Sequence, residues 1–122
     1  MTDTGLVVGD TATVHVASGG SLNVDLTGSG SAAVGYLSTS ASGSPAILNE
    51  GQFNVQGVQQ AVGAALGGSA NLTNSSVFTV VGDSAIGVTG YGATAGGFAS
   101  LVQAAIVNND SFTVTGGSSA IG

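Results

Sequence analysis

Three segments of this chain repeat one pattern, and the repeat limits the folds that the chain can adopt. The segments superpose when each is aligned on a phenylalanine: an aliphatic residue stands six positions before it, an asparagine four before, a valine two after and a glycine four after. In that column order the residues are Ile47, Leu72 and Ile106; Asn49, Asn74 and Asn108; Phe53, Phe78 and Phe112; Val55, Val80 and Val114; and Gly57, Gly82 and Gly116. Each copy closes on Ala-Val-Gly or Ala-Ile-Gly, at residues 61–63, 85–87 and 120–122. This many matched columns predict a repeat protein.

The spacing within each copy indicates β-strands. Phe-x-Val has the period of two that is typical of a strand. A unit this small cannot bury its apolar face alone, whereas stacked copies place Phe over Phe and Val over Val in a continuous core. The asparagines, at one turn position, then form a ladder of amide hydrogen bonds along the stack. We therefore expect a mainly all-β fold, a parallel β-helix or solenoid of degenerate repeats, in which these columns form the core and the assembly surface.

We expect residues 1–122 to form one β-rich repeat domain, with modules at 47–63, 72–87 and 106–122. Residues 11–35 have the features of a degenerate module, because apolar residues alternate there and Ala-Val-Gly recurs at 33–35. Aligned on Leu22 in place of the phenylalanine, this module has Ser18 in place of the asparagine. The distances between successive modules are unequal, so loops of variable length are expected between them.

A helical period competes with the strand pattern in two places. Apolar residues follow the i, i+3, i+4, i+7, i+8 spacing of an amphipathic helix over residues 58–66 and again over residues 98–106. Glycines at 57, 63, 67 and 68 weaken the first candidate, since each interior glycine costs about 0.5–1 kcal/mol relative to alanine. The second has a cleaner interior, and one short helix near 97–107 stays open as an addition to the strand core.

The charge composition excludes several classes of function. The chain has no Lys and no Arg, and its six acidic residues give a net charge of −6. Nucleic-acid binding depends on cations that neutralise phosphates, so we expect no nucleic-acid partner. No apolar run approaches the roughly 18 residues that span a bilayer, so we expect no membrane insertion. A chain without Lys or Arg offers trypsin-like proteases no cleavage site, which suits an extracellular or cell-surface location.

Side chains that carry chemistry are few and scattered. His15 is the only histidine, in an alternating run where a solvated strand position is expected, and one histidine without cysteine cannot make a typical zinc site. The acidic residues are too dispersed for a calcium site, and neither a nucleophile elbow nor a phosphate loop is present. We therefore predict no catalytic residue, no metal site and no cofactor, and expect that the chain is not an enzyme. The N-glycosylation sequon occurs at Asn71, Asn74 and Asn109.

The pattern aliphatic-x-Asn-x-x-x-Phe-x-Val-x-Gly over residues 47–122 resembles the Asn- and Gly-rich repeats of bacterial β-solenoid surface proteins. These include the passenger regions of autotransporter adhesins and filamentous-haemagglutinin-like proteins. A weaker likeness is to curli-like functional amyloid fibre subunits, although four glutamines occur here in one module only, at 52, 56, 59 and 60. The resemblance implies a parallel β-helix, display on a bacterial surface and a role in adhesion, biofilm or fibre formation. Those passengers are longer, more regular and membrane-anchored, and none of these features is visible here.

The repeat pattern continues to residues 119–122, and no charged or proline-containing cap follows it. An end unit of a solenoid without a cap exposes strand edges and core side chains. We therefore expect a structural subunit of an extracellular, self-assembling filament or biofilm matrix, whose partner is a second copy joined head to tail. The alternative is a surface adhesin or ligand-binding solenoid module that does not polymerise, for which surface glycans are candidate partners.

Overall fold

The computed structural model describes the chain except for residues 1, 9–11, 27–31, 39–43, 68 and 91–104. The described residues form strands and no helix, so the all-β prediction is confirmed at this level. The strands are β1 (Thr2–Val8), β2 (Thr13–Val16), β3 (Ser21–Leu26), β4 (Ala32–Ser38), β5 (Ala46–Asn49), β6 (Gln52–Gly57), β7 (Gln60–Leu66), β8 (Asn71–Asn74), β9 (Val77–Gly90), β10 (Ala105–Asn108) and β11 (Phe112–Ile121).

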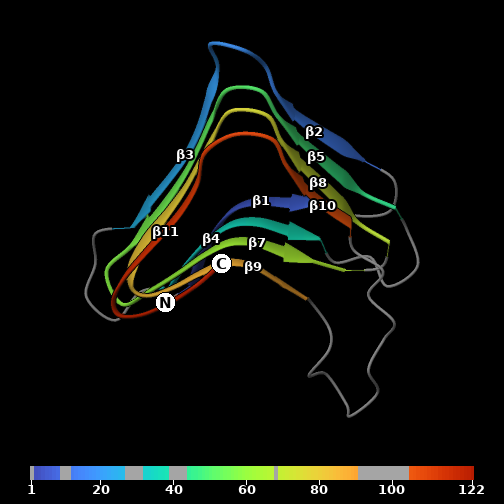
Figure 1. Cartoon of the computed structure of the whole chain (residues 1–122). Coiled ribbons are helices and arrows are strands. Elements are labelled where there is room, and N and C mark those ends of the chain that lie inside the picture. Colours follow the sequence, from blue (N-terminus) through green and yellow to red (C-terminus); the bar gives the residue numbers. More distant parts are fainter. Residues whose placement is uncertain (1, 9–11, 27–31, 39–43, 68, 91–104) are drawn as a thin grey trace.

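The strands are arranged in three columns, which Figure 1 shows as the sides of a triangle around the core. The first column is β2-β5-β8-β10. The second is β3-β6 followed by the first halves of β9 and β11, and the third is β1-β4-β7 followed by their second halves. Every pairing between these strands is parallel. Each circuit of the chain therefore adds one strand to each column.

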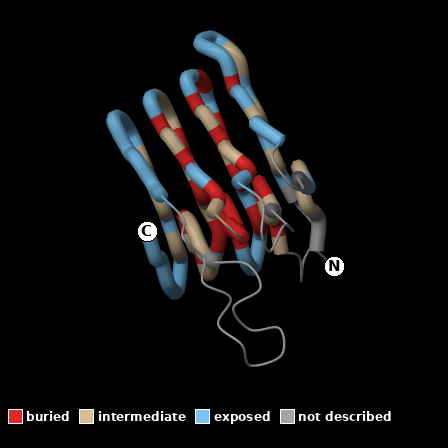
Figure 2. Tube along the Cα trace, turned by 90° about the vertical axis from the view of Figure 1, so that its right-hand side faces the viewer, coloured by how far each residue is buried: buried red, intermediate tan, exposed pale blue. Residues whose placement is uncertain are grey.

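We call each circuit a layer. Layer 1 is β2, β3 and β4; layer 2 is β5, β6 and β7; layer 3 is β8 and β9; and layer 4 is β10 and β11, while β1 precedes layer 1 in the third column. Figure 2 shows the layers from the side, with buried residues concentrated in the middle of the stack and exposed residues at both ends. The core is thus formed between layers.

Equivalent positions of the repeat are in register from layer to layer. Phe53 pairs with Phe78, and Phe78 pairs with Phe112. The valine, aliphatic and asparagine columns continue in the same way through β5, β8 and β10 and through β6, β9 and β11. One-residue slips would turn each apolar side chain to the opposite face of its strand, so the alternation fixes this register.

Layer 1 departs from the expected alignment at one corner. Four residues separate β2 from β3, whereas two separate β5 from β6, and Gly19 adopts a positive φ of 80° in this wider turn. Glycine adopts this backbone conformation without steric cost. The extra length means that Val16, and not Ser18, is in register with Asn49. The expectation that Ser18 occupies the asparagine position is therefore wrong.

The short helix considered near 97–107 is not found. Residues 105–107 belong to β10, which pairs with β8, and residues 97–104 lie outside the described part of the chain. Residues 58–66, which also have a helical spacing, contain strand β7. Short apolar runs fit both periods. Here a parallel neighbour in register satisfies the backbone of each segment, and this pairing decides in favour of strand.

Candidate functional site

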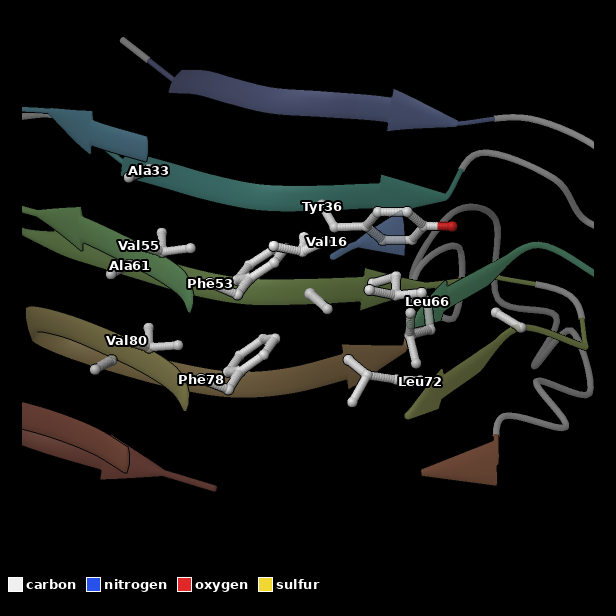
Figure 3. Packing of buried hydrophobic residues seen from close by; sticks show 14 residues of the cluster. Val16, Ala33, Tyr36, Phe53, Val55, Ala61, Leu66, Leu72, Phe78 and Val80 are labelled. Atoms are coloured by element: carbon white, nitrogen blue, oxygen red, sulfur yellow. The ribbon is translucent and has the colours of Figure 1, made fainter. Parts of the chain in front are cut away.

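The phenylalanine column is a continuous stack of rings. The ring centroids of Phe53 and Phe78 are 4.6 Å apart with an interplanar angle of 3°, and those of Phe78 and Phe112 are 4.8 Å apart at 8°. Figure 3 shows the first pair on adjacent strands, β6 and β9. Neighbouring strands lie about 4.7–4.9 Å apart, so in-register pairing alone sets this ring separation. Phe53 and Phe78 are fully buried, whereas Phe112 is half-buried.

The rings lie against glycines of the third column, which explains the closing Ala-x-Gly of each repeat. A Cβ atom added to Gly63 would lie 2.6 Å from Cε1 of Phe78, and one added to Gly87 would lie 2.6 Å from Cε1 of Phe112. Real Cβ atoms do not approach this closely. The glycine and phenylalanine columns therefore pack directly against each other, because the rings contact the backbone of the third column at the glycines.

The asparagine column is a hydrogen-bonded ladder. Nδ2 of Asn49 donates to Oδ1 of Asn74 at 2.7 Å, and Nδ2 of Asn74 donates to Oδ1 of Asn108 at 2.8 Å. The same nitrogens also donate to main-chain carbonyls, that of Asn49 to Val77 and that of Asn74 to Ser76 and Ser111. Asn49 and Asn74 are fully buried. Since each amide donates toward the next layer, the ladder has a direction, and its last donor is Asn108.

Layer 4 presents this same set of side chains on a face that no described strand covers. Ile106 is 51% exposed, and Phe112 and Val114 are half-buried. Among the described residues, the one acceptor of Nδ2 of Asn108 is the carbonyl of Asp110, within its own layer. A hollow of about 400 Å³ opens here, lined by Val88, Ile106, Asn108, Phe112 and Gly122. The uncovered face of layer 4 is the candidate assembly surface.

The three sequon asparagines have different surroundings. Asn71, the first residue of β8, and Asn109, which follows β10, are exposed, so their side chains are accessible to a modifying enzyme. Asn74 is fully buried and its amide belongs to the ladder. A glycan on Asn74 would displace its amide from the ladder, and glycosylation at Asn71, Asn74 and Asn109 stays a prediction.

A second asparagine contact lies on the outer face of the second column, and the sequence reasoning missed it. Nδ2 of Asn54 donates to Oδ1 of Asn23 at 2.8 Å. A shallow groove of about 320 Å³ runs along this face, and Gln56 and Thr79 also line it. The signal was present in the sequence, because Asn23 and Asn54 each follow the Leu or Phe anchor of their module.

The remaining chemistry-bearing side chains form no cluster. Nε2 of His15 lies 2.7 Å from Oε2 of Glu50, and both side chains are about half exposed. Among the residues that the structure describes, no three His, Cys, Asp or Glu side chains gather in a way that could hold a metal ion, and no helix is long and apolar enough to cross a membrane. Comparisons with protein-family models, curated proteins and solved structures found no match to this chain.

Proposed function

We propose that the chain is a parallel β-solenoid that serves as a structural, non-enzymatic subunit of an extracellular or cell-surface filament, with copies joined head to tail. The observation that carries this proposal is the likeness between the uncovered face of layer 4 and faces that the protein buries within itself. Layer 2 presents an Ile, Asn, Phe and Val set to layer 3, and layer 3 presents its Leu, Asn, Phe and Val to layer 4. Layer 4 presents the same set outward: Ile106, Asn108, Phe112 and Val114.

The chemistry of this face favours another parallel layer as its partner. Its exposed apolar side chains stand beside edges of β10 and β11 with which no described strand pairs, and such edges readily pair with another chain. Layer 1 of a second copy carries suitable residues. Within one copy, its Val14, Leu22 and Val24 already pack against the core, in register with the Ile, Phe and Val positions of layer 2. The uncovered face of layer 4 and layer 1 of a second copy are thus complementary at these apolar positions, whereas at the asparagine position Val16 of that layer would face Asn108.

Joining layer 4 of one copy to layer 1 of the next is a heterologous contact. Such contacts do not close on themselves when successive copies are related by translation along one axis, so they generate filaments. A chain with no Lys and no Arg has no tryptic site, which supports a role outside the cell. The chain then has a structural rather than a catalytic role, as a component of a surface fibre or matrix.

A matched pair of variants tests the proposal. Phe112→Asp and Thr113→Asp add the same charge to β11, but Phe112 belongs to the candidate assembly surface and Thr113 is exposed on the outer face. We expect the wild type and Thr113→Asp to form filaments with rising concentration, seen by sedimentation velocity and electron microscopy. Phe112→Asp should stay in small species. A wild type that is monomeric at every concentration, or normal filaments of Phe112→Asp, would overturn the proposal.

The outer groove favours a second function, that of an adhesin or ligand-binding module. The amides of Asn23, Asn54 and Gln56 are hydrogen-bonding groups that line this groove, which suits a polar ligand such as a surface glycan. Saturable glycan binding by a monomeric chain, lost in Asn54→Ala, would support this function in place of the filament.

A further inference from the structure

The third column has a row of aliphatic side chains on its outer side. In layer 2, Ala61 belongs to the hydrophobic core cluster, and a Cβ added at Gly63 would contact Phe78 and Val80 of that cluster. Side chains alternate between the two faces of a strand, so Val62, between Ala61 and Gly63, points outward. The residues in register at this position form a ladder across four strands: Val34, Val62, Ile86 and Ile121.

A second outward ladder lies three residues further along the same strands. In β7, Ala64 and Leu66 belong to the core cluster, so Ala65 between them points outward. The residues in register at this position are Val7, Leu37, Ala65 and Thr89. We call the two ladders together the apolar outer face. The outer side of the second column differs, because it carries the amides of Asn23 and Asn54.

Exposure along the apolar outer face follows from its ladder geometry. Val62 and Ala65, in the middle, are 9% and 6% exposed, although neither belongs to the core cluster. Ile121 and Val7, in the outermost strands of the two ladders, are each 59% exposed. Side chains in a ladder lie about 4.8 Å apart and pack on one another, so the face is a continuous apolar surface. In Figure 1 no described strand lies outside this side of the triangle.

Charge limits what can cover this face. None of the acidic side chains that the structure describes belongs to either ladder: Asp25 is on the outer side of the second column, and Glu50, Asp83 and Asp110 are exposed at corners. The chain has no Lys or Arg to pair with them, so two copies repel each other where acidic surfaces meet. Two copies can therefore approach each other most closely through the uncharged outer face.

The spacing of the ladders favours the same face of other copies as its partner. Each ladder presents a side chain about every 4.8 Å along the stack. A second stack of the same chain has the identical repeat, so the side chains of two such faces can interdigitate along their whole length, as in a steric zipper. A partner without this repeat would match few of the side chains.

The area of the face indicates how many copies are needed. Four strands span about 19 Å along the stack, and three residues separate the two ladders by about 10 Å, which gives about 200 Å² per copy. A stable interface buries about 800 Å² on each partner, so about four stacked copies supply the required area. Single copies therefore do not pair through this face, whereas stacks of copies do.

We propose that the apolar outer face joins two head-to-tail filaments side by side, with their third columns facing each other. Pairing begins only after several copies have stacked, so it follows elongation and strengthens with filament length. This inference rests on the proposed head-to-tail assembly and adds to it the surface through which filaments associate.

A matched pair of variants in β9 tests the pairing. Ile86→Glu and Val81→Glu each add one negative charge at a half-buried aliphatic residue, but Ile86 belongs to the apolar outer face and Val81 to the outer side of the second column. The measurement is the mass per length of filaments by scanning transmission electron microscopy. We expect the wild type and Val81→Glu to have twice the mass per length of Ile86→Glu.

Circular dichroism shows whether each variant is folded, and Leu37→Glu, on the same face in layer 1, replaces Ile86→Glu if the latter does not fold. Wild-type filaments that are single, a variant of the apolar outer face whose filaments stay paired, or Val81→Glu filaments that are unpaired would each overturn the pairing and leave head-to-tail assembly intact. If the wild type forms no filaments, the proposed function fails, and the pairing of filaments falls with it.

Discussion

Replacement of Asn74 by alanine should be the most costly change in the asparagine ladder. Its side chain is fully buried and takes part in four polar contacts: Oδ1 accepts from Asn49, and the two hydrogens of Nδ2 are shared among Oδ1 of Asn108 and the carbonyls of Ser76 and Ser111. Alanine removes all four and leaves a small cavity between layers 3 and 4.

The structure also limits the size of the effect. Asn49 is buried but retains its bond to the carbonyl of Val77, and the other three partners lie near solvent. One weakened buried amide and a small cavity together cost about 2–3 kcal/mol of unfolding free energy. Asn108→Ala should cost about 1 kcal/mol or less, because Asn108 is exposed. Asn54→Ala, on the outer face, should change stability by no more than about 0.5 kcal/mol.

The assay is denaturant unfolding of the three variants by circular dichroism, under dilute conditions where the chain is monomeric. The expected order of destabilisation is Asn74→Ala, then Asn108→Ala, then Asn54→Ala, with unchanged dependence on denaturant. Equal effects of Asn74→Ala and Asn54→Ala would refute the reasoning, because an inner and an outer asparagine would then contribute alike.

Three further predictions follow from the packing and the charge. Gly63→Ala should lower the unfolding free energy by about 1–3 kcal/mol in thermal or denaturant unfolding, since its Cβ would overlap the Phe78 ring, whereas Gly122→Ala, with open space around it, should have no effect. Burial raises the pKa of Tyr36 above its ordinary value of 10.0, so the stability tied to its neutral form is complete below pH 10 and is lost as pH rises through the folded-state pKa. Tyr36→Phe should remove that alkaline loss in unfolding experiments and, because the Tyr36 hydroxyl has no described hydrogen-bond partner, add about 1 kcal/mol at neutral pH. Copies that each carry a net charge of −6 repel one another, and raising the salt from 0.01 to 0.15 M shortens the Debye length from about 30 to about 8 Å. Light scattering should therefore show faster assembly at the higher salt, and slower assembly would contradict this electrostatic repulsion.

Spacing in the sequence was enough to predict the columns. Phe53, Phe78 and Phe112 share one register because a strand has a strict period of two, so equal offsets to a valine and an asparagine imply equal positions in space. Equal offsets in sequence give equal register only where the turn between the two strands has the same length in each layer. The wider corner after β2 shifts Val16 into the asparagine column, and no residue between Val16 and Leu22 signals this from its identity alone.

The repeat pattern could not predict which residues of different columns contact one another across the core. The closing glycines recur in the sequence, but their reason is the approach of Phe78 to Gly63 from another side of the triangle. Tyr36 stands in register with Ala64, so the third column accepts a ring in one layer and a methyl group in the next. The helical spacing around Ile106 was misleading because small apolar residues satisfy both periods, and only pairing with β8 distinguishes them.

The axial rise of the filament tests most directly whether layers of one copy stack on layers of the next. Helical reconstruction by cryo-electron microscopy should show strands perpendicular to the filament axis and a rise of about 19 Å per copy, which is four strand spacings of about 4.8 Å. A chain that forms no filament, or a filament whose strands run along its axis, would contradict the claim that stacked layers of this protein bind further layers of the same kind.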